Sequence, residues 1–273
     1  MHTLVIDTSY GSTVGIVGHE PISESDSRTH VERLQADIAA AFRHASAGPH
    51  DLERIIVGTG PAPFTGLRAG IVTAQALAFA TGAIIIPQDD LTPNAALMHA
   101  AHRHDPRLRD VLDYNAISRF TGRDIGVTLA LNDARRKQLY FTLTMDHDGL
   151  ETPTVLIDMD IDRPDAIADR VQDALDELRE RHPQHAITLD IIGHGARKYA
   201  DAWQSLDAQN ILDTSPLDLG ASGMELFAHT AIRHNQATDP AGIEPLYLRR
   251  PDVSVPNPLK HVLGHAPTKG NAA

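Results

Sequence analysis

Apolar positions in the first part of the chain fall into short runs and one helical pattern. Residues 4–6 and 13–17 form two runs around a polar turn, which predicts two antiparallel strands. Residues 22–27 are a weaker candidate for a third strand. Within 29–47, apolar residues recur every three or four positions, which predicts an amphipathic helix.

Thr29 and Glu32 have the spacing of a capping box, which would begin this helix. Apolar runs at 55–57 and 84–86 predict two further strands, and the alanine-rich segment 65–81 between them predicts a helix. The expected order of elements is therefore three strands, a helix, a strand, a helix and a strand.

A loop rich in glycine and proline, residues 58–70, leads into the helix predicted at 65–81. Such a loop presents unpaired N–H groups that could bind a phosphate. The P-loop pattern requires Gly-Lys-Ser/Thr at its end, however, and positions 66–68 read Gly-Leu-Arg. Alternatively, the glycines allow close packing against the backbone. A helix this apolar on all sides is expected to be buried, either in its own core or by a partner.

The middle of the chain has a less regular pattern of apolar residues. Residues 91–101 can form a helix, whereas 102–126 mix His, Arg, Asp and Pro without a clear period and are interpreted as an insertion or linker. His99, His102 and His104 could bind a metal. Their spacing matches no standard site, so a histidine-bearing surface helix is the favoured interpretation.

The pattern of the first two strands recurs later. Apolar runs at 127–131 and 139–143 flank a turn that begins with Asp133, just as the first pair flanks a turn that begins with Asp7. Two such hairpins suggest an internal duplication. We therefore predict an N-terminal lobe over 1–101, the insertion or linker over 102–126, a C-terminal lobe over 127–250 and a disordered tail over 251–273.

The C-terminal lobe is expected to hold further elements of both kinds. Its pattern predicts an amphipathic helix over 165–181, a strand over 187–192 and an extended segment over 244–251. A capping-box pattern at 222–225 predicts a second helix that ends near Asn235.

Composition narrows the function classes. The chain has 273 residues, no cysteine and a formal net charge of −12. The lack of cysteine excludes disulfides, thiolate metal sites and a cysteine nucleophile. The negative net charge and the lack of an evident basic face disfavour direct binding of RNA or DNA. No run of about 18 apolar residues occurs, so no membrane span is expected. No positively charged region precedes a long apolar segment at the N-terminus, so no signal peptide is expected.

Asp7 and Asp133 are the main candidates for chemistry, because aspartates at such turns hold a metal-bound nucleotide in two-lobed nucleotide-binding proteins. The turns begin Asp-Thr-Ser and Asp-Ala-Arg-Arg, without a glycine directly after the aspartate that would let the backbone approach phosphate. One interpretation is an ATP-dependent small-molecule kinase with Asp7 or Asp133 as the base. The favoured one is a vestigial nucleotide site, formed by Asp7, Thr8, Ser9, Asp133, Arg135, Gly193 and Gly195.

No metal site or catalytic triad is predicted. His261 and His265 have the spacing of a helical ligand pair, but a glycine between them and prolines around them disfavour a helix. The Gly-x-Ser-x-Gly elbow of serine hydrolases is absent from the sequence.

Taken together, several segments resemble the TsaB (YeaZ) family, a bacterial component of the machinery that makes threonylcarbamoyladenosine on tRNA. The most specific is Phe64-Thr65-Gly66-Leu67-Arg68. Residues 62–63, Ala-Pro, depart from the usual Gly-Ser of the family, and 102–126 look longer than usual. The individually weaker matches follow family order over about nine-tenths of the chain, at 4–9, 30–34, 58–70, 133–140, 193–195 and 245–249.

The resemblance implies an α/β fold of the ASKHA type (actin/Hsp70-like), with two RNase-H-like lobes and mixed sheets. It implies a non-catalytic scaffold or activator subunit that pairs with the catalytic subunit TsaD and helps recruit TsaE for the synthesis of N6-threonylcarbamoyladenosine (t6A37). The chain itself then needs no cofactor or metal, because ATP or ADP and metal are expected on TsaD. It would reach tRNA only within the complex, contact no membrane and be cytoplasmic.

In this family the helices of the first lobe form the pairing surface, which corresponds here to 29–47 and 65–81. Similar proteins self-associate through the same surface without TsaD, so a homodimer is expected in its absence. The implied partner-binding residues are His30, Glu32, Arg33, Leu34, Phe64, Thr65, Gly66, Leu67, Arg68, Ile71 and Ala74.

Overall fold

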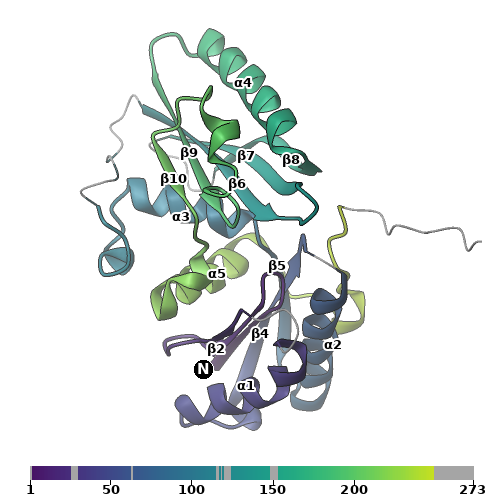
Figure 1. Ribbon diagram of the computed structural model, residues 1–273. Helices are drawn as coiled ribbons and strands as arrows, with labels where there is room; N and C mark the ends of the chain where they lie inside the picture. The colour runs from purple at the N-terminus through teal and green to yellow at the C-terminus, as the bar shows by residue number, and fades with distance from the viewer. Residues whose placement is uncertain are drawn as a thin grey trace, which may run out of the picture.

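The protein is built from two mixed five-stranded sheets with helices on both faces, seen one above the other in Figure 1. The fold is that of a computed structural model. Both the predicted cap Thr29 and the predicted tail 251–273 lie outside the described residues. The structure describes residues 2–25, 30–62, 64–114, 117, 119, 124–147 and 153–248, with His30 and Phe64 described by their backbone alone.

The first sheet has the strand order β3-β2-β1-β4-β5. β1 pairs antiparallel with β2 and parallel with β4, which in turn pairs parallel with β5. Helices α1 (His30–His44) and α2 (Phe64–Thr81) cover one face. The predicted order of elements in this lobe is confirmed. The strands are β1 (His2–Asp7), β2 (Ser12–Ile16), β3 (Ile22–Glu24), β4 (Leu52–Gly60) and β5 (Ile84–Asp89).

The second sheet has the order β10-β9-β6-β7-β8. Counted from its own first strand, this is the arrangement of the first sheet, which confirms the internal duplication. Helix α4 (Pro164–Arg181) covers one face with its predicted apolar side. The pattern had not predicted β8 or β10. The strands are β6 (Asp124–Asp133), β7 (Leu139–His147), β8 (Thr154–Asp162), β9 (Ala186–Gly193) and β10 (Asn210–Leu212).

Two helices cross between the lobes and form the layer that separates the sheets (Figure 1). Helix α3 (Thr92–His102) comes from the first half of the chain but packs on β6 and β9 of the second sheet. Helix α5 (Gly220–His234) comes from the second half but packs on the first sheet against Val5, Ile56 and Ile86. Each half of the chain therefore contributes one helix to the packing of the other half.

The start of α5 also differs from the prediction. The helix begins at Gly220 and is preceded by Leu219 without a side-chain cap, so Ser222 lies inside the first turn instead of capping it. After α5 the chain returns across the first lobe. There Thr238 donates its N–H to the Ile85 carbonyl at 3.0 Å, and Leu246 donates to Thr59 at 2.8 Å. This last described segment therefore belongs with the first sheet.

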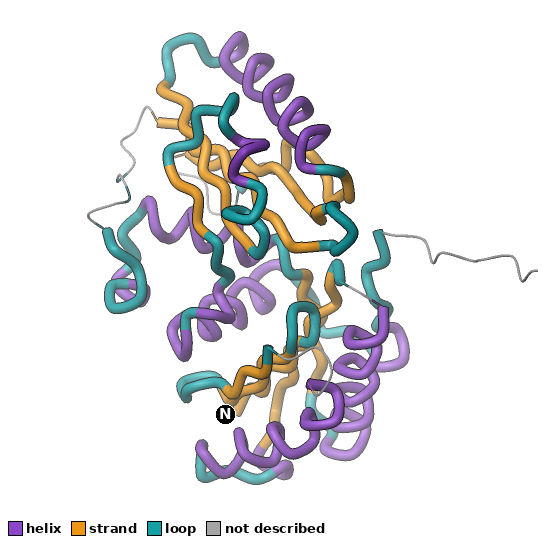
Figure 2. Tube along the Cα trace, in the orientation of Figure 1, coloured by secondary structure: helices purple, strands orange, loops and turns teal. Residues whose placement is uncertain are grey.

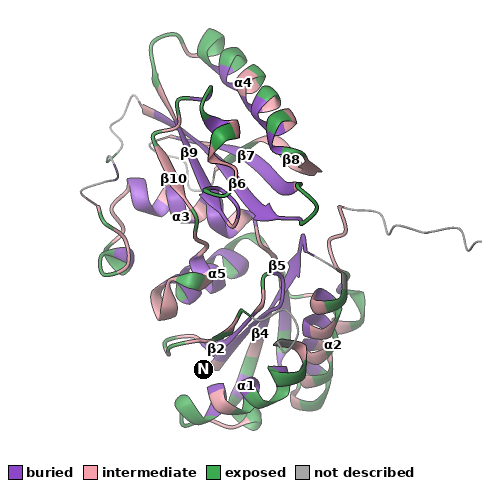
Figure 3. Ribbon diagram, in the orientation of Figure 1, coloured by how far each residue is buried: buried purple, intermediate pink, exposed green. Residues whose placement is uncertain are grey.

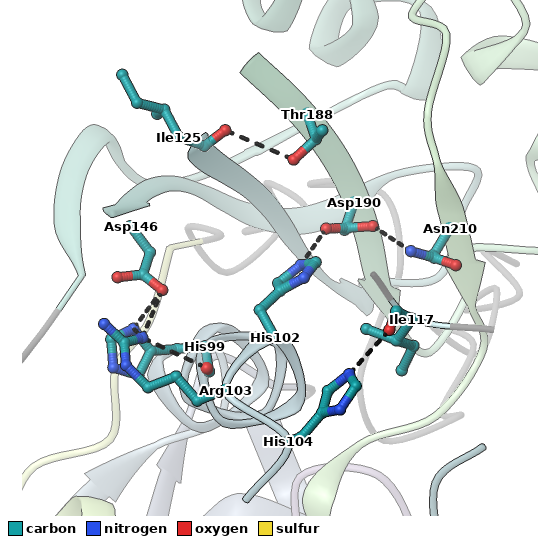
Figure 4. A network of polar contacts seen from close by, with 10 residues as sticks. All are labelled: His99, His102, Arg103, His104, Ile117, Ile125, Asp146, Thr188, Asp190 and Asn210. Atoms are coloured by element: carbon teal, nitrogen blue, oxygen red, sulfur yellow. Dashed lines mark hydrogen bonds and ion pairs between the residues drawn. The ribbon is translucent and has the colours of Figure 1, made fainter. Parts of the chain in front are cut away.

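The histidines of α3 are structural, and the expectation of a surface helix is wrong. His102 is 2% exposed, and its Nε2 lies 2.6 Å from the Asp190 carboxylate on β9 (Figure 4). His99 pairs with Asp146 at 2.6 Å, and His104 contacts the Ile117 carbonyl at 3.1 Å. Each ring thus has its own partner. No group of three or more His, Cys, Asp or Glu side chains among the described residues could hold a metal.

Short 3-10 helices lie within the connections between the main elements, whose loops and turns are drawn in teal in Figure 2. Within the described part of the chain, no helix is both long and apolar enough to cross a bilayer. The 3-10 helices are η1 (Pro49–Asp51), η2 (Pro106–Leu108), η3 (Ala200–Trp203), η4 (Pro216–Asp218) and η5 (Pro240–Gly242).

Candidate functional site

A small cavity lies where the ends of the two sheets meet. Its volume is about 30 Å³, which is room for one or two water molecules. Small-molecule sites usually measure several hundred Å³, so a nucleotide does not fit in this geometry. The polar side chains that line the cavity come from both halves of the chain and include Asp7, Ser9, Tyr10, Asp90, Asn94, Asn132 and His194.

Asp7 sits at the end of β1, on the face of the sheet that turns toward α5. One carboxylate oxygen accepts the Ser9 N–H at 3.0 Å and the other accepts the Ser9 hydroxyl at 3.0 Å. Gly58 on the neighbouring strand makes this position possible, because a Cβ there would lie 1.8 Å from Oδ2 of Asp7. Burial raises the pKa of the Asp7 carboxyl despite these hydrogen bonds.

Asp90 follows β5 and brings a second carboxylate to the cavity. Neither of its buried oxygens has a hydrogen-bond partner among the described residues. Burial, and then the neighbouring charge of Asp7, raise the pKa of Asp90 well above its usual range. Two carboxyl groups in one buried site resist ionising together, so this end of the cavity favours a bound positive charge.

Two asparagines add amide oxygens to the same cavity. Asn94 on α3 is 2% exposed and Asn132 on β6 is 4% exposed. Asn94 donates its Nδ2 to the Leu131 carbonyl at 3.2 Å, which leaves its oxygen facing the cavity. Within the described part of the chain, the Oδ1 atoms of both asparagines lack a hydrogen-bond donor.

An aromatic contact bridges the lobes beside the cavity. The rings of Tyr10 and His194 stack with centroids 3.8 Å apart and an interplanar angle of 14°. His194 Nε2 in turn lies 2.8 Å from the carboxylate of Asp218. Burial opposes the ionisation of Asp218, but the hydrogen bond and charge of His194 outweigh it and lower the pKa of this carboxyl. The contact holds the first-lobe turn against the second lobe.

The structure does not assemble the predicted nucleotide site, of which Asp7 and Ser9 alone line the cavity. Successive residues of a strand point to opposite faces, so Asn132 faces the cavity and Asp133 faces away from it. Asp133 instead pairs with Lys198 at 2.8 Å and accepts the Arg135 N–H at 2.8 Å. Asp133 is therefore not placed to act as a catalytic base.

The remaining members of that predicted set serve the local backbone. Thr8 packs so closely on α2 that a Cβ at Gly70 would lie 2.3 Å from its hydroxyl. Arg135 is exposed in a left-handed turn with φ 63°. Gly193 and Gly195 both have positive φ, and a Cβ on either would meet neighbouring atoms at 2.0 and 2.8 Å. The glycines thus fit the packing of the second lobe and do not cradle a ligand.

Of the implied partner-binding residues, Leu34, Leu67, Ile71 and Ala74 are buried in the first-lobe core. Their side chains pack in that core and are not part of the exposed surface of the free chain. The structure leaves exposed Glu32, Arg33, Thr65 and Arg68, while Gly66 is half-buried and the side chains of His30 and Phe64 lie outside the described part.

Arg68 is tied to the end of the described chain. Its Nε donates to the Tyr247 hydroxyl at 2.7 Å, and its guanidinium lies 5.7 Å from the centroid of that ring. The two residues belong to the most specific and to the last of the segments that carry the family resemblance. Their contact fixes the C-terminal segment on α2.

The opposite face of α2 carries apolar side chains that sequence reasoning missed. Phe79 is 91% exposed and Val72 is 60% exposed, and the exposed Ala76 and Ala80 lie between and beside them on the helix. We call these four residues the α2 strip. In Figure 3 the outer surface of α2 is exposed, whereas α3 is mostly buried. The helical pattern could not reveal the strip, because both faces of α2 are apolar.

Comparisons with known proteins agree with this architecture. A family model described as TsaD, tRNA N6-adenosine threonylcarbamoyltransferase, matches residues 17–108. An uncharacterised protein of Mycobacterium tuberculosis is 31% identical over 256 residues, covering 91% of this chain and 92% of the relative. The tRNA threonylcarbamoyladenosine biosynthesis protein TsaB of Haemophilus influenzae is 33% identical over 82 residues, covering 30% of this chain and 35% of that protein.

Among solved structures, YeaZ from Pseudomonas aeruginosa aligns with a TM-score of 0.58 at 20% identity, over 90% of this chain and 99% of that one. This likeness confirms the expected two-lobed ASKHA-type α/β fold. The chain belongs to the same family as the mycobacterial protein, and it resembles the TsaB (YeaZ) proteins over part of its sequence and in its fold.

Proposed function

We propose that this chain is a non-catalytic TsaB-type subunit in the biosynthesis of threonylcarbamoyladenosine on tRNA, and that it pairs with a TsaD-type partner. The observation that carries the pairing is the α2 strip, which leaves Phe79 91% exposed on a helix whose other face is already buried. In this proposal the protein acts in the cytoplasm, helps recruit TsaE, and uses the strip for a homodimer when TsaD is absent.

The physical argument concerns the cost of exposed apolar surface. Covering a Phe or Val side chain contributes roughly 1.5–3 kcal/mol. Exposed apolar residues that cluster on one helix are typical of a protein interface. The neighbouring helix α1 presents the exposed Ala36 and Ala39, so small side chains there would let a partner helix approach.

A non-catalytic role is supported by the state of the candidate chemical groups. The cavity between the lobes is too small for a nucleotide, and Asp133 is engaged by Lys198. The net charge of −12 also favours indirect access to tRNA, through a partner that supplies the positive charge.

The test is co-purification with the TsaD-type protein of the same organism, using size-exclusion chromatography with light scattering. We expect a one-to-one complex from the natural chain and none from the double variant Val72→Glu/Phe79→Glu. Val155→Glu is the matched control, since Val155 is a 53% exposed valine on β8 of the other lobe. A substitution at Leu67 or Ala74 would not serve, because both side chains are in the core.

Cellular t6A content provides the second measurement. In a strain that depends on this chain, Val72→Glu/Phe79→Glu should deplete t6A in tRNA, as measured by mass spectrometry of nucleosides, and Val155→Glu should not. Retention of the complex by the double variant would refute the assignment of the strip. Normal t6A after deletion of the whole chain would refute the role in this pathway.

A further inference from the structure

The cavity between the lobes gathers oxygen acceptors from three parts of the chain. Asp7 comes from the end of β1, Asp90 and Asn94 from the end of β5 and the start of α3, and Asn132 from β6. The two Asp90 oxygens and the amide oxygens of Asn94 and Asn132 are all buried without a donor among the described residues. Buried acceptors are normally satisfied, so four in one cavity indicate a missing ligand.

Three residues that line the cavity already direct donors elsewhere. Ser9 gives both its N–H and its hydroxyl to Asp7, and His194 Nε2 faces Asp218. Asn94 has turned its amide N–H₂ toward the Leu131 carbonyl. The cavity thus presents negative and partly negative oxygens, which a positively charged ligand would complement.

We propose that this cavity binds one hard divalent cation of the Mg²⁺ class, held by the carboxylates of Asp7 and Asp90 and the amide oxygens of Asn94 and Asn132. An all-oxygen set of this kind suits Mg²⁺, Ca²⁺ or Mn²⁺ rather than zinc. A volume of about 30 Å³ accommodates an ion with one or two of its waters.

The cation would join the lobes. Asp7 belongs to the first sheet and Asn132 to the second, and Asn94 lies on the helix that crosses between them. An ion shared by all three fixes the lobes relative to one another at the point where Tyr10 stacks on His194. This inference rests on the cavity alone and is independent of pairing through the α2 strip.

The experiment uses the full chain, stripped of metal with EDTA and dialysed. Electron paramagnetic resonance and calorimetry with Mn²⁺ should show one bound ion per chain, displaced by excess Mg²⁺, and thermal unfolding should shift upward when Mg²⁺ is added. Asp90→Asn and Asn132→Leu should each weaken Mn²⁺ binding by about tenfold or more. The control is Asp173→Asn, which removes an exposed carboxylate of α4 and should bind like the natural chain.

A shared proton between Asp7 and Asp90 is the competing explanation, and Asp90→Asn separates the two. If the cavity is a cation site, Asp90→Asn should unfold at a higher temperature than the natural chain in metal-free buffer, because it removes one of two neighbouring carboxylates. Its unfolding temperature should then no longer rise when Mg²⁺ is added. No Mn²⁺ binding and no shift by about 10 mM Mg²⁺ in the natural chain would overturn the proposal in favour of the proton. Equal loss of Mn²⁺ by Asp173→Asn and Asp90→Asn would overturn it in favour of surface binding.

Discussion

Helices α2 and α3 are both rich in alanine and apolar on most sides, yet the fold places them differently. Helix α3 is enclosed between the lobes, and its buried His102 has a partner in Asp190. Helix α2 is covered on one side, and Phe79 and Val72 remain exposed on the other. An apolar helix in a sequence therefore has two outcomes, burial within the chain or burial by a partner, and its composition does not distinguish them.

The largest expected effect separates the two faces of α2. Ala74 is 0% exposed in the first-lobe core, whereas Ala76, two residues later, is exposed. Ala74→Glu buries an unpaired charge and should cost more than about 4 kcal/mol, which is enough to unfold a marginal lobe. Ala76→Glu should change the free energy of unfolding by about 0.5 kcal/mol or less.

Urea unfolding followed by circular dichroism measures both variants. If Ala74→Glu and Ala76→Glu unfold at the same urea concentration, then the orientation of α2 differs from the one described. That result would also remove the argument that the exposed strip is available to a partner, since the strip would then be part of the core.

The second prediction concerns the enclosure of α3. His102→Ala leaves the 0% exposed Asp190 without its 2.6 Å contact, although Asn210 still donates to its other oxygen at 2.7 Å. Removal of one partner from such a buried pair should cost about 3 kcal/mol. His44→Ala on the exposed end of α1 is the control and should have almost no effect. Equal unfolding midpoints for these two variants would show that the buried pair does not anchor α3.

The third prediction compares two phenylalanines. Phe79→Ala should leave the stability of the free chain unchanged within about 0.5 kcal/mol, because the ring is 91% exposed. Phe227→Ala removes a 2% exposed ring of α5 and should cost about 3–5 kcal/mol. The complex with a TsaD-type partner should respond in particular to Phe79→Ala, with an affinity loss of about tenfold or more. Full affinity after this change would separate the strip from pairing.

Local patterns predicted much of the fold. The alternation of short apolar runs gave the first lobe in the right order, because its strands are buried on both faces and its turns are polar. The recurrence of the hairpin pattern also predicted the second lobe. Strand β8 was missed although polar and apolar residues alternate over its second half, which is the pattern of a half-buried strand. Strand β10 was missed because it has three residues. The burial of α3 was missed because it depends on contact between distant halves of the chain.

The cavity was harder to predict than the fold. Asp7 and Ser9 were found from the turn after the first strand. The repeat then suggested Asp133 as the counterpart of Asp7, whereas the strand places Asn132 in the cavity, one position earlier. Asp90 follows β5 at the carboxyl end of a parallel strand, which is where sites form, so this signal was available in the sequence. Asn94 carried no local signal, since it becomes part of the cavity through the packing of α3.

The smallest expected effect comes from a comparison of two histidine–aspartate pairs. His102 and Asp190 lie at the centre of the layer around α3, and His194 and Asp218 lie at its edge. The pair of His194 and Asp218 has a 2.8 Å contact like the inner pair, but the Asp218 side chain is 45% exposed. Solvent screens such a pair, so Asp218→Asn should cost about 0.5 kcal/mol at pH 7.

The pKa of Asp218 is lowered in the folded state by the hydrogen bond from His194, although burial of the carboxyl acts in the opposite direction. The contribution should therefore be present above the unfolded pKa of about 3.9 and disappear as the pH falls through the lowered pKa. Urea unfolding of the natural chain and Asp218→Asn at pH 7 and at about pH 3 measures this difference, with Asp173→Asn as the control. A loss at pH 7 as large as that of His102→Ala would mean that exposure does not decide the strength of these pairs, and the contrast between enclosed and exposed elements would fail.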